Sequence, residues 1–171
     1  MARRSGDDLV SELNRYGLRF MRGTGDLGSE PQLSPVELMV ALTDQPEARL
    51  RLALIPLLLV RPQLATSISA ALARLDPPAQ LTLKFFYTAA VFLQQIHAAR
   101  LSPHISRIEN LPDLFSSELG VAQSGTLEDR LHQLGRQHRA RTGQFVNWVG
   151  TYQSGAAHLL RQLEQEALWQ R

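Results

Sequence analysis

The sequence predicts an all-α protein built as an irregular helical bundle. Apolar residues recur at helical spacing through most of the chain, and the alternating pattern of strands is almost missing. Of the 171 residues, 44% are hydrophobic and 20% are charged, a composition typical of globular proteins. The chain has no cysteine, which excludes disulfides, iron–sulfur clusters and thiol nucleophiles. We therefore expect one domain, residues 1–171, of about six to seven helices.

Residues 1–33 are predicted to form an N-terminal helix and a glycine-rich loop. From Asp7 to Arg22 the acidic residues come first and the arginines last, which is the order that the helix dipole favours. The glycines in residues 23–28 match the pattern G-x-G-x-x-G. That fingerprint binds a dinucleotide when a strand precedes it, whereas a helix is expected here. We therefore interpret these glycines as a helix end and a loop.

Residues 34–101 are predicted to be the core helices. A capping box at residues 34–37 predicts a helix that ends near Asp44. The next helix, residues 45–60, is apolar on nearly every side, so it should be buried on more than one face, with a kink at Pro56. These features resemble a degenerate pair of HEAT-type helices.

Two further helices complete this core region. A helix of small residues follows Pro62, and residues 76–78 mark a break and a new start. The helix expected over residues 79–101 carries four aromatic residues within eight positions. Because aromatic side chains bury a large apolar area, we predict this helix to be the central core helix.

The segment 102–125 is predicted to be an irregular arm. Two prolines and two glycines interrupt it, and helical periodicity is lost. A structureless stretch of this length is unusual inside a compact domain. It is therefore either packed against the body of the protein or a functional arm. Packing would use its apolar residues Ile108, Leu111, Leu114 and Phe115.

Residues 126–171 are predicted to be the basic C-terminal helices. The first of them begins at Thr126 and ends at residues 142–143, where a glycine follows a threonine. The last helix begins either near Gln144 or only after Gly150. The spacing of its apolar residues does not distinguish these two starting points.

A candidate binding surface lies in these C-terminal helices. No acidic residue occurs between Asp129 and Glu164, whereas arginines and histidines are frequent there. Guanidinium groups beside aromatic rings suit phosphate contact and base stacking, and they equally suit an acidic protein surface. A third interpretation is an ordinary amphipathic helix, with the aromatics in the core and the arginines in solvent. The candidate residues are Arg130, Arg136, His138, Arg139, Arg141, Asn147, Trp148 and Tyr152.

The motifs of the common enzyme classes are missing. Neither G-x-x-x-x-G-K-[ST] nor G-x-S-x-G occurs, and no two histidines have the i, i+4 spacing that would place them on one metal. The ribonuclease motif of HEPN-type toxins pairs an arginine with a histidine at a short spacing. Arg100 lies too close to His104 for this motif, and Arg130 lies too far from His138. We therefore predict no catalytic residue, no cofactor and no metal site, and an RNA-directed hydrolase is the least favoured function.

Four stretches carry a family resemblance: ALIPLLLVRPQLA at 53–65, LKFFYTAAVFLQ at 83–94, LPDLFSSELG at 111–120, and LGRQHRARTG with the NW and TY pairs that follow it at 134–152. Together they resemble a family of small all-helical proteins of Chloroflexus-type bacteria and cyanobacteria. The resemblance covers the chain from about Ser34 onward, and it includes no catalytic signature. In that family the gene often lies beside one for a minimal nucleotidyltransferase, so the resemblance implies a partner protein rather than a reaction.

The predicted function is that of a non-enzymatic binding or regulatory subunit, with a bacterial nucleotidyltransferase as its partner in an antitoxin-like or defence pair. A homo-oligomer is the other protein arrangement considered. The alternative function is an RNA- or DNA-binding module that uses the basic C-terminal third. No segment has the roughly 20 apolar residues of a membrane span, and the N-terminus has no signal-peptide pattern. We therefore expect a cytoplasmic protein with no membrane partner.

Overall fold

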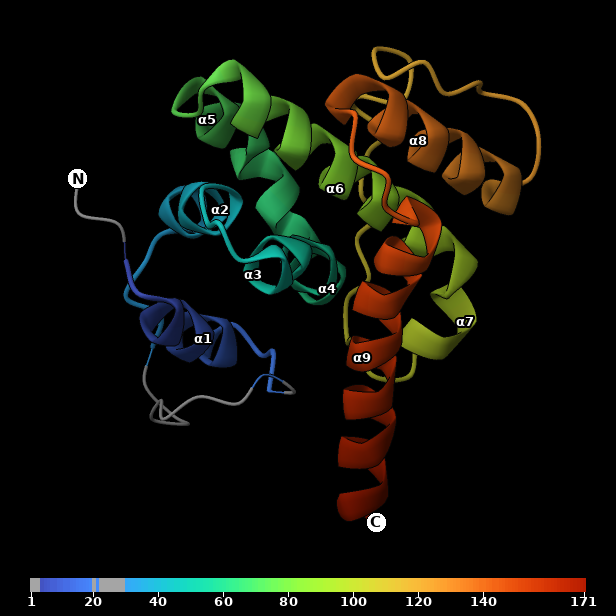
Figure 1. Cartoon of the computed structure of the whole chain (residues 1–171). Coiled ribbons are helices and arrows are strands. Elements are labelled where there is room, and N and C mark those ends of the chain that lie inside the picture. Colours follow the sequence, from blue (N-terminus) through green and yellow to red (C-terminus); the bar gives the residue numbers. More distant parts are fainter. Residues whose placement is uncertain (1–3, 20, 22–29) are drawn as a thin grey trace.

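Helices and their connections make up the computed structural model, which describes residues 4–19, 21 and 30–171 (Figure 1). No strand occurs among these residues, so the predicted all-α class is confirmed. The glycines in residues 23–28, interpreted above as a helix end and a loop, lie outside the described residues. The buried apolar side chains of the described part form one cluster.

The first helix is shorter than predicted. Helix α1 covers Gly6–Arg15, and Ser5 caps its start by accepting a hydrogen bond from the Asp8 N–H. The predicted extension toward Arg22 is wrong, because the chain leaves the helix at Tyr16 and Gly17. Gly17 has φ +106°, a left-handed conformation that ends a helix and that glycine adopts at little cost.

The predicted capping box begins helix α2, Pro35–Thr43. The Ser34 hydroxyl accepts a hydrogen bond from the Glu37 N–H at 3.3 Å, and the Glu37 carboxylate accepts one from the Ser34 N–H at 2.9 Å. The two interactions satisfy two backbone donors that a helix start leaves without partners.

The predicted kinked helix is instead two short helices, α3 (Ala48–Leu52) and α4 (Leu54–Val60). The break falls at Ala53, three residues before Pro56. Proline has no N–H to donate to the carbonyl four residues earlier, and its ring crowds that carbonyl, which belongs to Leu52. A 3₁₀ helix (Pro62–Ser67) and helix α5 (Ile68–Ala73) follow.

Helix α6, Pro77–Ile96, is the central helix of the fold, as predicted. Asp76 caps it by accepting a hydrogen bond from the Ala79 N–H at 2.9 Å. All four aromatic side chains of this helix are buried, and the helix contacts α4, α8 and α9 (Figure 1). Helix α7, Ala98–Leu101, continues it after a break at His97.

Two long helices form the C-terminal part and enclose the candidate site. Helix α8, Leu127–Thr142, begins at the predicted Thr126 cap and ends at Gly143, which has φ +68°. Helix α9, Trp148–Trp169, starts after the Asn147 cap. Neither predicted start of the last helix is right, because the true start lies between them. Figure 1 shows the C-terminal half of α9 extending beyond the other helices.

Among the described residues, no single helix has the length and apolar character needed to cross a membrane. One bent pair in the described part of the chain, Ala48–Val60 with Pro62–Ala73 at 116°, meets that requirement by length and composition when its halves are combined.

Candidate binding groove

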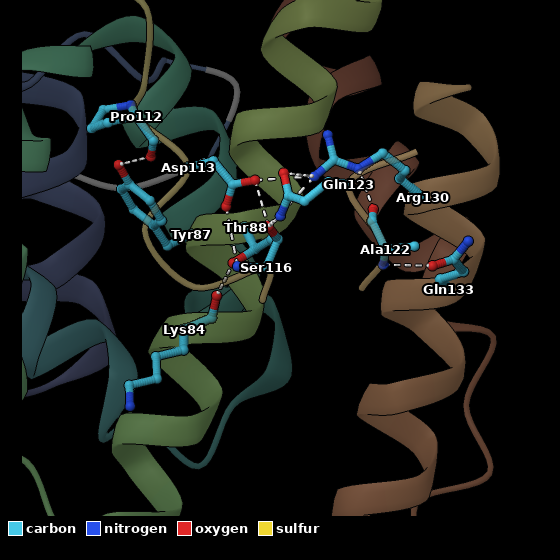
Figure 2. Close-up of polar contacts among 10 residues, drawn as sticks. All are labelled: Lys84, Tyr87, Thr88, Pro112, Asp113, Ser116, Ala122, Gln123, Arg130 and Gln133. Atoms are coloured by element: carbon cyan, nitrogen blue, oxygen red, sulfur yellow. Dashed lines mark hydrogen bonds and ion pairs between the residues drawn. The ribbon is translucent and has the colours of Figure 1, made fainter. Parts of the chain in front are cut away.

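The segment 102–125 is packed against the body of the protein, which decides between the two alternatives for the predicted arm. The Tyr87 hydroxyl donates a hydrogen bond to the Pro112 carbonyl at 2.7 Å (Figure 2). The Gln94 amide holds the arm at two points, donating to the Glu109 carbonyl and accepting from the Leu111 N–H, both at 2.8 Å. Burial raises the pKa of Tyr87, with Asp113 as a smaller cause, so this hydroxyl stays a donor.

The apolar residues of the arm contribute unequally to this packing. Leu111 is buried, and Ile108 and Phe115 are partly buried against the core. Leu114 is 47% exposed, so the prediction that it packs inward is wrong. The next apolar positions, Leu119 and Val121, are buried in its place.

The Arg130 side chain, on α8, bonds to this arm and does not line an open surface. Its guanidinium donates to the Asp113 carboxylate at 3.1 Å and to the Ala122 carbonyl at 2.9 Å (Figure 2). Its Cζ atom lies 4.5 Å from the centroid of the Phe92 ring, and its side chain is only 12% exposed. Arg130 therefore does not lie free on an open surface as the predicted binding set implies, since its charge is already balanced inside the fold.

His138 and Tyr152 are core residues, which also corrects the predicted surface. The His138 ring lies between the rings of Phe85, at 4.2 Å and 1°, and Trp148, at 3.5 Å and 13°. Its Nδ1 atom is 2.5 Å from the Tyr152 hydroxyl. Burial lowers the pKa of His138 to about 3 and raises that of Tyr152, so both side chains are neutral near pH 7.

The exposed members of the predicted set are Arg136, Arg139, Arg141 and Asn147. Arg141 donates a hydrogen bond to the Glu118 carbonyl at 2.9 Å, which ties it to the arm. Asn147 caps α9, because its side-chain oxygen accepts from the Gly150 N–H at 3.0 Å. Arg136 has no hydrogen bond or ion pair among the described residues.

A groove of about 450 Å³ lies between α8 and the start of α9. Its lining includes no acidic residue. Four predicted residues line it, Arg136, Arg139, Asn147 and Trp148, together with five that were not predicted: His132, Gly135, Phe145, Val146 and Val149. The structure thus brings half of the predicted set to one place, and it adds an apolar surface beside the two arginines.

Phe145 is the most unusual of these residues, because it is 85% exposed. The Cζ atom of Arg139 lies 4.5 Å from the centroid of its ring, within the range of a cation–π contact. By sequence spacing alone, Phe145 would count among the apolar positions of the last helix. A local signal could have distinguished Phe145 from the helical apolar positions. Phe145 lies between Gly143, which ends a helix, and Asn147, which caps the next one.

At Gly135, which lines the groove, α8 lies very close to α9. A Cβ atom added at Gly135 would lie 2.9 Å from Cγ2 of Val149, closer than real Cβ atoms approach a neighbour. The Trp148 ring packs next to this point, and its buried Nε1 atom has no hydrogen-bond partner among the described residues. The groove therefore has a rigid apolar floor and a cationic edge.

A second shallow hollow adjoins the groove and shares His132 and Arg136 with it. It also includes Asp129, so the acid-free surface ends there. In the part of the chain that the structure describes, no three His, Cys, Asp or Glu side chains gather to hold a metal ion. The prediction of no metal site and no catalytic residue stays a prediction.

Comparison with protein-family models, with curated proteins and with solved structures gives no match to this chain.

Proposed function

We propose that this protein is a non-enzymatic binding or regulatory subunit, and that the groove between α8 and α9 binds its partner protein. The observation that carries the proposal is the exposed Phe145 ring beside two arginines on an acid-free edge. Aromatic and arginine side chains provide most of the energy at protein interfaces. Because Gly143 and Asn147 hold the short loop at both ends, little conformational entropy would be lost when a partner buries Phe145.

A protein partner is favoured over a nucleic acid by the number of available cations. Arg130 is paired inside the fold and Arg141 is tied to the arm, so Arg136 and Arg139 are the arginines of the predicted set that line the groove. Two phosphate contacts would give a salt slope of about 1.4 for a single strand, much less than typical nucleic-acid binders show. The apolar floor adds little to phosphate binding but suits a protein surface.

The proposed partner is a bacterial nucleotidyltransferase in an antitoxin-like or defence pair. This part of the proposal rests on the resemblance of the four sequence stretches, two of which supply groove or arm residues. The HEAT-like pairing of helices in residues 34–101 also remains a proposal. It is supported by the contact of α4 with α6 and by the capping box that starts α2.

Partner capture from the native host tests the proposal. Tagged wild-type protein should retain a stoichiometric protein, identified by mass spectrometry, and Phe145→Ser should retain at least about tenfold less, equal to about 1.4 kcal/mol. The control is Leu168→Ser, which removes an exposed apolar side chain at the far end of α9. Equal capture by both variants would exclude the groove. Capture that nuclease treatment abolishes would support the nucleic-acid alternative instead.

A further inference from the structure

Resting on the proposed function, we infer that the groove takes a short acidic segment of the partner, in which a carboxylate stands beside an aliphatic or aromatic side chain. The inference concerns which chemistry enters the groove. It depends on the charge at the edge, on the apolar floor and on the size of the space between them.

The positive charge at the edge of the groove favours an anionic group in the ligand. None of the described acidic side chains forms an ion pair with Arg136 or Arg139. The two residues are three positions apart on α8, so their side chains leave the same face of the helix. A carboxylate is a planar acceptor that matches the donors of a guanidinium, which makes it a suitable partner for either arginine.

The apolar floor of the groove favours a ligand with an apolar side chain next to that anionic group. Val146 is 43% exposed, Val149 is partly buried, and the Trp148 ring lies beside them. Covering exposed apolar surface of this kind with an apolar side chain is favourable, because water is released from both surfaces. A free phosphate or a sugar–phosphate chain would leave it in water.

The volume of the groove limits the ligand to a short segment of the partner's polypeptide chain. A volume of about 450 Å³ lies in the range of small-ligand sites and holds about two or three side chains. The hollow next to it includes Asp129, which would repel a long polyanion running along α8. The site therefore fits a short acidic segment with one apolar anchor better than it fits a nucleic-acid strand.

Selection from a phage-displayed library of random peptides on the full chain tests the inference. After counter-selection on Phe145→Ser, the retained peptides should be enriched in Asp or Glu next to Leu, Ile, Phe or Trp. The best retained peptide, labelled with fluorescein, should bind the wild type, and Arg136→Gln should weaken that binding about tenfold in anisotropy titrations. Arg141→Gln is the matched control, because Arg141 lies on the same helix outside the groove, and it should change the affinity less than about twofold.

A charge swap gives a second readout. The Arg136→Glu variant should no longer bind the acidic peptide and should bind the same peptide with its acids changed to lysine. The Arg141→Glu variant should still prefer the acidic peptide. The inference is overturned if retained peptides lack acids, if the swap changes nothing, or if oligouridylate binds the wild type more tightly than the peptides do. If no peptide binds while partner capture still depends on Phe145, the inference fails and the proposed function stands. If capture is also independent of Phe145, both fail.

Discussion

At the scale of single residues, the position of His138 decides its chemistry. Its ring is stacked between Phe85 and Trp148 and is only 2% exposed. Burial removes the water that would stabilise the imidazolium ion, and this lowers the pKa of the ring to about 3. His138 therefore acts as a neutral aromatic side chain that holds α6, α8 and α9 together, with one polar contact to Tyr152.

The first prediction is that His138 makes the fold sensitive to acid. Between pH 6.5 and about 3, the unfolded chain binds a proton on this ring and the folded chain does not, so stability falls as the pH falls. At pH 5 the loss from this residue should be about 2 kcal/mol relative to pH 7.5. Urea unfolding at the two pH values should show a smaller loss for His138→Phe than for the wild type.

The control for this experiment is His132→Gln, which changes an exposed histidine on the same helix and should keep the wild-type pH dependence. Some dependence should survive in His138→Phe, because burial also lowers the pKa of His97. An identical loss of stability in His138→Phe and the wild type would show that His138 is protonated in the folded protein.

The second prediction compares two arginines on α8 that the sequence does not distinguish. Arg130→Met should lower the free energy of unfolding by about 2 to 3 kcal/mol, because the Asp113 carboxylate loses its ion-pair partner and the Ala122 carbonyl loses a donor. Arg136→Met should change it by less than about 0.5 kcal/mol, because Arg136 has no partner to lose. Urea titrations followed by circular dichroism measure both. Equal effects would contradict the assignment of Arg130 to the arm.

At the scale of elements, the contact between α8 and α9 depends on one small residue. Gly135 lies buried in the middle of α8, where glycine is otherwise unfavourable. The Val149 side chain from the first turn of α9 occupies the space that a Cβ atom would need. This close approach brings the two arginines of α8 and the Phe145 loop together around one groove.

The third prediction follows from that approach. Gly135→Ala should destabilise the protein by about 1 kcal/mol despite the higher helix propensity of alanine, because its methyl group would overlap Val149. In a Val149→Ala background the same change should be neutral or stabilising, since the overlapping atom is gone. A double-mutant cycle in thermal unfolding measures the coupling. Additive effects would mean that the helices separate freely at this point.

At the scale of the whole molecule, polar contacts join the two ends of the described chain. Gln162 on α9 donates to the Gly17 carbonyl at 3.0 Å and accepts from the Arg19 N–H at 2.8 Å. The buried Glu12 carboxylate on α1 accepts a hydrogen bond from the Leu33 N–H at 2.9 Å, just before α2. Helix α1 is thus attached to the segment before α2, and the segment that follows α1 is attached to α9.

The fourth prediction tests this attachment. Gln162→Leu should cost about 1 kcal/mol, because the Gly17 carbonyl and the Arg19 N–H would lose a partner in two partly buried hydrogen bonds. Hydrogen exchange should speed up in α1 more than in α6. Gln165→Leu, an exposed position one turn further on, is the control and should leave both rates unchanged. Equal acceleration in both helices would indicate global destabilisation rather than release of α1.

The sequence by itself was enough for the helical class, the capping box of α2 and the central position of α6. These features depend on neighbours within a few residues along the chain, such as Ser34 with Glu37, or on the apolar character of a whole helix. The end of α1 and the break at Ala53 also have local causes, in Gly17 and Pro56, whose exact effect sequence patterns do not resolve.

Only the tertiary structure decided which residues of the basic stretch remain available for binding. Arg130 is unavailable because its guanidinium contacts Asp113 and Phe92, which lie 17 and 38 positions away along the chain. Phe145, in contrast, is left in water beside Arg139. Residues close together in the sequence can have opposite environments, because burial is set by what other segments of the chain pack against them. That information resides in contacts between distant parts of the chain, and helical periodicity does not carry it.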